Sequence, residues 1–181
     1  ARFFGLGTNL IAGAFFSGQV ATSSLASKPL ASTLFGQPYA TGIPQELEFV
    51  YQYKAGAKVI HGEGKNVELP AQDKGSVSAV FYEVTDDAAF LNGTNLQTDS
   101  RIIAKGYAEL EPTEGTDWVT YKLPLEVVNQ ERDKAIDLTT KKYRLALVFS
   151  SSYRGAEYIG AVGSELLLKK VTIKDRPRLK N

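Results

Sequence analysis

The chain has 181 residues, of which 43% are hydrophobic, and its 21 basic and 20 acidic side chains leave a net charge of +1. This length suits one β-sandwich-sized domain with a real core, and the balanced charge argues against nucleic acid as a partner. The absence of cysteine excludes disulfide scaffolds, thiol nucleophiles and thiolate metal sites. We therefore expect a single domain over residues 1–181.

The opening segment, residues 3–16, is apolar and has some features of a signal peptide. It lacks a basic region beyond Arg2, its glycines would weaken a helix, and no run approaches the roughly 18 apolar residues that span a bilayer. We expect a first pair of strands here and no transmembrane segment. Because no initiator methionine is present, we expect the chain to be a processed or excised piece of a longer protein.

Most of the chain reads as strands separated by turns. Apolar and aromatic residues alternate with polar ones in 48–54, 77–84, 102–110, 118–125 and 143–149, and a further apolar strand leads to Leu168. Only the polar stretch 126–140 is compatible with a short helical turn. This pattern predicts an all-β, antiparallel sandwich rather than a parallel α/β sheet. The aromatic residues expected to face inward are Phe49, Tyr51, Phe81, Tyr121 and Phe149.

Three other features of the sequence indicate a loop, a strand edge and a terminal tail. Residues 36–44 contain two prolines and two glycines, which predicts a loop. Pro124 predicts an edge position or a bulge for its strand. The basic segment 169–180 is interpreted as a solvated terminal tail rather than a site for a polyanion.

The chain offers little catalytic chemistry. His61 is the only histidine and lies in a glycine-rich turn, so we expect an exposed loop histidine and neither a catalytic triad nor a histidine metal site. Candidate acids for a glycosidase pair exist, but sequence alone does not place two of them roughly 5–10 Å apart. Asp86 and Asp87 read as a turn, with a structural calcium site as the alternative, and no other cofactor is expected. The candidate acids are Asp86, Asp87, Glu109, Glu111, Asp117 and Glu157.

The most informative stretch is residues 150–164, a serine-rich turn followed by glycines at 155, 160 and 163. We expect these glycines to allow positive φ angles. The loop presents Tyr153, Arg154, Glu157 and Tyr158 at one end of a sheet, where binding sites tend to lie.

Aromatic residues are the stronger functional signal. Sugar rings have apolar faces, so their binding sites combine flat side chains with a few hydrogen-bonding groups. Tyr39, Tyr153 and Tyr158 lie in loops and Trp118 starts a strand, although ordinary packing explains many such positions. The predicted carbohydrate-binding residues are Tyr153, Arg154 and Glu157, with Tyr39 and Trp118 near them.

Several blocks resemble those of one known family, described as "Putative carbohydrate metabolism domain". Residues 36–39 with 49–54 resemble its G-x-P-F … G-Y-Y-K-Y block, 77–82 its I-x-A-x-L-Y strand, and 118–121 its W-x-x-F strand. Residues 149–164 resemble its F-S-S-S-x-x-G-D-x-F-x-G-A-x-G-S signature, and the likeness extends over roughly 10–173. Two positions depart from the family: Glu157 replaces an aspartate, and Leu168-Lys169-Lys170-Val171 replaces an acidic L-x-V-D-D block.

The resemblance implies a jelly-roll β-sandwich similar to galactose-binding-like and carbohydrate-binding modules. Such domains stand at the C-terminal end of exported, often lipid-anchored bacterial proteins linked to glycan use. We therefore expect an extracytoplasmic location at the bacterial cell surface, in the outer membrane or in the periplasm. The expected partner is a glycan or oligosaccharide, together with neighbouring domains of the same protein.

Three functions remain open at this stage. The first is a non-catalytic carbohydrate-binding or accessory module, the second a glycoside hydrolase with paired carboxylates, and the third a structural or adhesion module that binds protein. The missing nucleophile chemistry favours the first over the second. Nothing in the sequence separates the first from the third.

Overall fold

The computed structural model describes residues 10, 12–25, 27–62, 66–85 and 90–177. Within them the protein is all-β and its sheets are antiparallel, as predicted, with two short α-helices and one turn of 3-10 helix, η1. The elements of the first half are β1 (Ala14–Phe16), β2 (Gly18–Val20), α1 (Pro29–Ser32), β3 (Thr33–Phe35), β4 (Gln37–Pro38), β5 (Pro44–Lys54), β6 (Val59–His61), β7 (Val67–Leu69) and β8 (Gly75–Glu83). Those of the second half are β9 (Leu91–Asn92), β10 (Ile102–Leu110), β11 (Val119–Pro124), β12 (Glu126–Val127), α2 (Gln130–Lys134), β13 (Tyr143–Ser150), η1 (Gly155–Glu157), β14 (Ile159–Ala161) and β15 (Glu165–Asp175).

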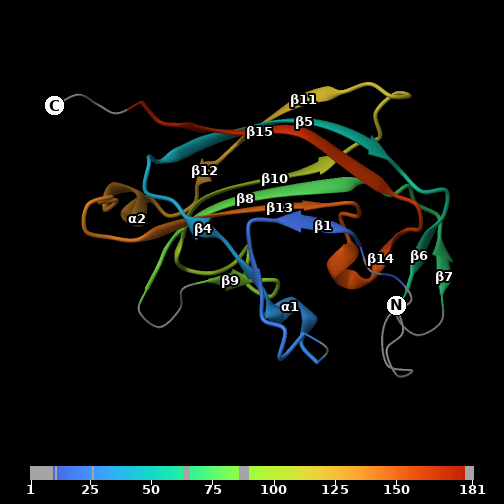
Figure 1. The fold of residues 1–181 in the computed structure, drawn as a ribbon, viewed down its shortest axis with the longest axis horizontal. Coiled ribbons are helices and arrows are strands. Elements are labelled where there is room, and N and C mark those ends of the chain that lie inside the picture. Colours follow the sequence, from blue (N-terminus) through green and yellow to red (C-terminus); the bar gives the residue numbers. More distant parts are fainter. Residues whose placement is uncertain (1–9, 11, 26, 63–65, 86–89, 178–181) are drawn as a thin grey trace.

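Two sheets pack face to face around the main core. The central sheet has the order β1-β13-β8-β10-β12, with β4 beside β13, and the second sheet has the order β11-β5-β15. Figure 1 shows β5, β11 and β15 along one side of the long strands β8, β10 and β13. Of the residues predicted to face inward, Phe49, Tyr51, Phe81 and Phe149 are buried, and Tyr121 is partly buried and packs against them.

The chain crosses several times between these two sheets. β8 and β10 are neighbours in the central sheet, but β10 is followed by β11 in the second sheet, and the next long strand after β13 of the central sheet is β15 of the second. β5 accordingly lies between β11 and β15, two strands that come much later in the chain. The core is therefore closed by contacts that are distant in sequence.

A smaller layer covers part of the other face of the central sheet. The strands β2, β3 and β9 pair with one another there, and Phe35, Val80, Tyr82, Leu91, Ile102 and Ala146 form a second buried cluster. Figure 1 shows β9 and α1 on the side of the central sheet away from β5 and β15.

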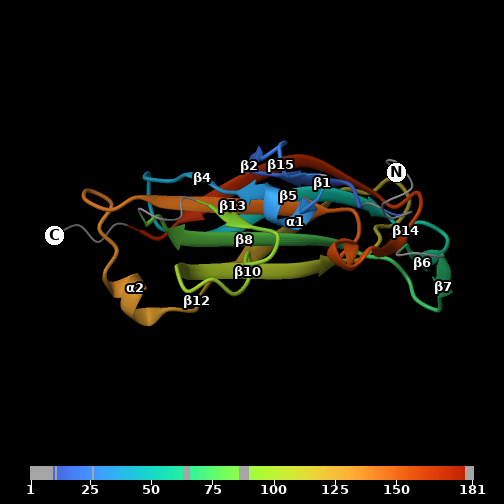
Figure 2. The ribbon, with the colours of Figure 1, turned by 90° about the horizontal axis from the view of Figure 1, so that it is seen from below.

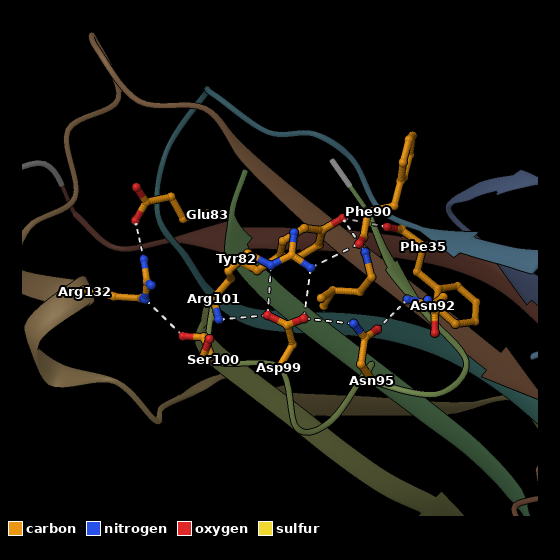
Figure 3. A network of polar contacts seen from close by, with 11 residues as sticks. Phe35, Tyr82, Glu83, Phe90, Asn92, Asn95, Asp99, Ser100, Arg101 and Arg132 are labelled. Atoms are coloured by element: carbon orange, nitrogen blue, oxygen red, sulfur yellow. Dashed lines mark hydrogen bonds and ion pairs between the residues drawn. The ribbon is translucent and has the colours of Figure 1, made fainter. Parts of the chain in front are cut away.

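A buried polar network lies beside this second cluster (Figure 3). Arg101 is 7% exposed, and its Nε and Nη2 donate to the two carboxylate oxygens of Asp99, each at 2.9 Å. The Arg101 guanidinium also donates to the carbonyl oxygen of Phe90, and Asn95 donates to Asp99. The hydrogen bonds from the Arg101 side chain hold the pKa of Asp99 below its usual range, against the opposing effect of burial. We refer to this set as the Asp99–Arg101 network.

The structure of β11 and α2 confirms two local predictions, and that of β15 corrects a third. β11 is an edge strand that ends at Pro124, and α2 provides the expected helical turn, where Asn129 caps the N-terminus. The predicted basic tail is wrong over its first half, because β15 continues to Asp175 and places Lys169, Lys170 and Lys174 on a strand. A bulge interrupts its pairing with β5 between Leu168 and Lys170.

Other local predictions need correction. The expected first strand pair falls mostly on residues outside the described ones, and what is described is β1 and β2. The predicted loop 36–44 contains β4, which pairs with β13 because the edge position tolerates Pro38. His61 is not a loop residue: it ends β6 and lies opposite Ile159 of β14. No helix among the described residues is long and apolar enough to cross a membrane.

Candidate functional site

The glycine-containing loop lies between β13 and β15 and includes η1 and β14. β14 pairs with β6, which pairs in turn with β7. Figures 1 and 2 both show β6, β7 and β14 at one end of the molecule, with α2 at the other. The loop therefore marks one end of the sandwich, as predicted.

A buried carboxylate organises this loop. Asp73 is 1% exposed, and its Oδ2 accepts hydrogen bonds from Ser152 Oγ at 2.6 Å, Ala161 N at 2.8 Å and Ser164 Oγ at 2.7 Å. Its Oδ1 accepts from the backbone N–H of Lys74 at 2.9 Å. We call this arrangement the Asp73 knot. It shows that Ser152 and Ser164 of the signature stretch are scaffold residues, since their hydroxyls donate to a buried acid.

The glycines of the loop serve two different purposes. Gly163 has a φ of 87°, as predicted, but Gly155 and Gly160 do not adopt positive φ. At Gly160 a Cβ would collide with Ser152 Oγ of the Asp73 knot, so glycine is required for close packing. Tyr158, which lies between Gly155 and Gly160, has a left-handed backbone with a φ of 59°.

Three predicted site residues come together on the outside of the loop. Arg154 Nη2 lies 2.6 Å from Glu157 Oε2, and both side chains are exposed. The hydrogen bond from Arg154 lowers the pKa of Glu157 against a smaller opposing effect of burial, and nearby His61 lowers it further. Tyr153 adjoins this pair, and its N–H donates to the carbonyl oxygen of Lys74 at 2.8 Å.

The other two predicted residues lie elsewhere. Tyr39 OH donates to Asp175 Oδ1 at 2.7 Å, at the far end of β15 from the loop. A strand of this length spans roughly 33 Å. Burial, and then the bond to Asp175, raise the pKa of Tyr39 to about 12. Trp118 lies just before β11 on the second sheet, 43% exposed, with Lys169 Nζ 5.6 Å from its ring centroid.

The structure adds residues to the loop that sequence reasoning did not connect with it. Tyr107 on β10 is 50% exposed, and burial together with the charge of Glu109 and the proximity of Tyr153 raises its pKa. Lys74 Nζ lies 3.1 Å from Glu109 Oε2 and 2.7 Å from Glu111 Oε1. We call this surface the Tyr107 face; it consists of Lys74, Ser76, Tyr107, Glu109, Glu111 and Tyr153.

The Tyr107 face belongs to the outer side of the central sheet. Glu109 lies opposite Ser76 and Tyr107 opposite Ser78, whereas the intervening Ala108 and Leu110 are buried in the core. The alternation of small or apolar with large polar residues in 104–110 was the signal that could have identified Tyr107 as outward. Lys74, Ser76 and Tyr153 could not be connected with Tyr107 in the same way, because they lie outside β10.

This surface can bind a polar ligand with apolar faces. It carries the exposed ring of Tyr107 and the partly exposed ring of Tyr153 for stacking. One ammonium and two carboxylates can form hydrogen bonds, and the backbone is fixed by strands and by the Asp73 knot. Among the described residues no group of three or more histidines and acids is placed to hold a metal ion. Asp86 and Asp87, the predicted calcium alternative, lie outside the described residues.

A groove opens on the other side of the loop, between the edge strands β1 and β15. Its volume is about 610 Å³, and a second hollow of about 410 Å³ continues along β15. Phe15, Leu166 and Leu168 line both, and Phe15 is 65% exposed. Among the three functions considered from the sequence, protein binding is the one that would use this apolar groove.

The fold and these surfaces define an antiparallel all-β domain whose signature loop is locked onto a buried aspartate beside an aromatic, charged face. The chain belongs to the family described as "Putative carbohydrate metabolism domain", whose sequence profile matches residues 2–174, as the motif resemblance predicted.

Two of the solved structures that are similar to the chain are putative glycoside hydrolases. A putative glycoside hydrolase from Bacteroides thetaiotaomicron VPI-5482 has 34% identity and a TM-score of 0.81, and the match covers 92% of this chain and 48% of that one. A putative glycoside hydrolase from Bacteroides vulgatus ATCC 8482 has 28% identity and a TM-score of 0.76, with 90% and 65% covered. The chain thus spans about half of the first structure and less than two thirds of the second. A comparison with curated proteins found no match.

Proposed function

We propose that the chain is a non-catalytic carbohydrate-binding or accessory module, and that its glycan ligand binds on the Tyr107 face. The observation that carries the proposal is the proximity of exposed Tyr107 to Tyr153, beside the Lys74 ammonium and its two carboxylate partners. Membership of a carbohydrate-related family supports a sugar as the ligand.

The chemistry of the face suits a sugar. An exposed tyrosine ring offers a flat surface for the C–H groups of a pyranose, and its hydroxyl can form hydrogen bonds at the rim. Tyr107 is carried by a nine-residue strand in the sheet, and the Tyr153 N–H donates to the Lys74 carbonyl oxygen, so the backbone at both tyrosines is fixed before the ligand arrives. Such preorganisation reduces the entropy lost on binding.

The finer fold assignment belongs to the same proposal. The long strands cross repeatedly from one sheet to the other, a feature that jelly-roll folds share. We therefore place the chain with galactose-binding-like jelly rolls. Since the match covers 48% of one neighbour, we further propose that the chain is the C-terminal module of a longer, exported bacterial protein for glycan utilisation, located at the cell surface, in the outer membrane or in the periplasm.

Glycoside hydrolysis is the alternative, because both structural neighbours are putative glycoside hydrolases. Glu109 and Glu111 are the acids closest to the proposed site. They point to the same side of one strand end and share Lys74, whereas a hydrolytic pair must flank the scissile bond from two sides. This geometry favours binding over catalysis.

A glycan array with the purified chain tests the proposal. We expect selective binding by the wild type and its loss in Tyr107→Ala and in Tyr153→Ala. Tyr39→Phe, at the opposite end of the sandwich, is the matched control and should bind like the wild type. Binding that persists in both tyrosine variants, or a silent array with folded protein, would contradict the proposal.

Catalysis is tested separately with the oligosaccharides that bind. We expect chromatography to show no shorter products after long incubation. Products that appear with the wild type and disappear with Glu109→Gln would establish the hydrolase alternative instead.

A further inference from the structure

We propose that the outer face of the second sheet is a separate binding site for polysaccharides that contain uronic acids, with Trp118, Lys169 and Lys170 as its central residues. The inference builds on the proposed carbohydrate-binding function, but it uses the opposite side of the sandwich from the Tyr107 face.

The geometry follows from the strand register. Val119 lies opposite Tyr51, a core residue, so Trp118 on the preceding position and Gln52 on β5 point outward. β15 lies on the other side of β5 from β11. Its Leu167 lies opposite Gln52, and its Lys170 lies opposite Val50. The bulge at Lys169 places its ammonium 5.6 Å from the centre of the Trp118 ring. An exposed indole and an ammonium therefore share one place on a flat sheet surface.

Positive charge predominates on this part of the sheet. Lys174 binds Glu46 and Glu48 at 2.8 and 2.7 Å, and Lys122 lies 3.9 Å from Glu48, so the two acids of β5 are already engaged. Among the described residues no carboxylate forms an ion pair with Lys169 or Lys170. The cation–π contact of an exposed lysine is weak, so Lys169 can leave the ring for an anionic ligand.

The third observation is an unused hydrogen-bond donor. Within the described part of the chain, Gln52 Nε2 is buried and has no hydrogen-bond partner. Gln52 lies on the central strand of the sheet, between Trp118 and Leu167. A buried amide without a partner is unfavourable, and an acceptor oxygen from a ligand would satisfy it if the side chains around it move apart.

These features together select the ligand class. A uronic acid carries its carboxylate on the same ring that stacks on an aromatic side chain, which matches an ammonium next to an indole ring. A neutral sugar would use the ring but not the lysines. A simple inorganic anion would use the lysines but not the ring.

Titration calorimetry with polygalacturonate and its fully methyl-esterified form tests the site. The two polymers share a backbone and differ in charge. We expect the wild type to bind polygalacturonate at least about tenfold more tightly than the ester, and Trp118→Ala and Lys169→Ala each to weaken that binding about tenfold. Added salt should weaken it because exposed charges are screened. Lys58→Ala, which removes the same charge just before β6, and Tyr153→Ala should both bind like the wild type.

The outcomes separate this inference from the proposed function. Equal binding of acid and ester, or wild-type affinity in both Trp118→Ala and Lys169→Ala, would overturn the site. Loss of neutral-glycan binding in Tyr107→Ala with polygalacturonate binding intact would support two independent sites. Equally tight binding of single-stranded DNA that depends on the same residues would overturn the sugar assignment, since the face would then be a general polyanion surface.

Discussion

The buried carboxylate of Asp73 and the partly buried carboxylate of Asp99 are stabilised in opposite ways. Asp99 is paired with the Arg101 guanidinium, and its other partners lie within a few residues along the chain (Figure 3). The described partners of Asp73 are hydroxyls and backbone N–H groups, and apart from Lys74 they come from a loop 79 to 91 residues later. The first network fixes a turn, whereas the second fixes a loop against a distant strand start.

This difference indicates which network supports the candidate site. Disrupting Asp99 should damage the turn that leads into β10 and the layer around Phe35. Disrupting Asp73 should release Ser152, Ala161 and Ser164 together, and with them Tyr153 on the Tyr107 face. Stability and ligand binding should thus be coupled at Asp73 and less so at Asp99.

The largest effect is expected from Asp73→Ala. The substitution leaves two hydroxyls and two backbone N–H groups without their buried acceptor, which should cost about 4–5 kcal/mol of unfolding free energy. Urea denaturation measures the loss, and hydrogen exchange should show the amide of Ala161 exposed. Asp117→Ala, which removes an exposed acid, should be close to neutral. A small effect at Asp73 would mean that the loop is held by other contacts.

Asp99→Asn should cost less, about 3 kcal/mol, because the side chain keeps its size and part of its hydrogen bonding while Arg101 loses its counter-charge. The folded pKa of Asp99 is lowered, so its contribution is present above the ordinary aspartate pKa and is lost as pH falls through the lower folded value. Acid unfolding curves should therefore be less steep for the variant. Identical curves below about pH 4 would show that Asp99 does not titrate with folding.

Tyr53→Phe tests the support beneath the loop at alkaline pH. The hydroxyl donates to the Ser151 carbonyl oxygen at 2.9 Å, and its removal should cost about 1 kcal/mol. Burial raises the pKa of Tyr53 to about 12. The stability it confers is present below the ordinary tyrosine pKa and is lost as pH rises through the folded one, so the variant should be less sensitive between about pH 10 and 12. Equal sensitivity would assign the effect to other tyrosines, such as Tyr39.

The smallest effect on stability is expected from Arg154→Ala. Its ion pair with Glu157 is exposed on both sides, and such pairs contribute little because solvent screens them. The urea midpoint should not change measurably, whereas glycan binding on the Tyr107 face should weaken. A clear loss of stability would place Arg154 in the scaffold with the Asp73 knot.

Much of the fold could be predicted from local patterns. The alternation in 48–54 and 143–149 identified strands whose aromatic residues are buried, and Pro124 identified an edge. The errors have local causes too: the lysines after Leu168 were interpreted as a tail because charge conceals a half-exposed strand, and β4 was hidden by Pro38. Which strand pairs with which was not readable, because β5 joins partners far away in sequence.

The candidate site was predictable only in part. Tyr153, Arg154 and Glu157 were found because they follow one another in a single loop. Tyr107, Lys74 and Glu111 meet them through sheet register, which no local pattern encodes. Tyr39 and Trp118 were chosen for residue type alone, and pairing with Asp175 and Lys169 places them at other parts of the sheets.

The bulge in β15 has a consequence for self-association. Among the described strands β15 is an edge strand of eleven residues, and a long, regular edge invites pairing with the same edge of another molecule. The irregular step at Lys169 breaks the ladder that such a partner would need, and adjacent lysines would repel an identical strand. Replacing the two lysines to abolish ligand binding would therefore also remove a safeguard against aggregation, so solubility must be followed in any such variant.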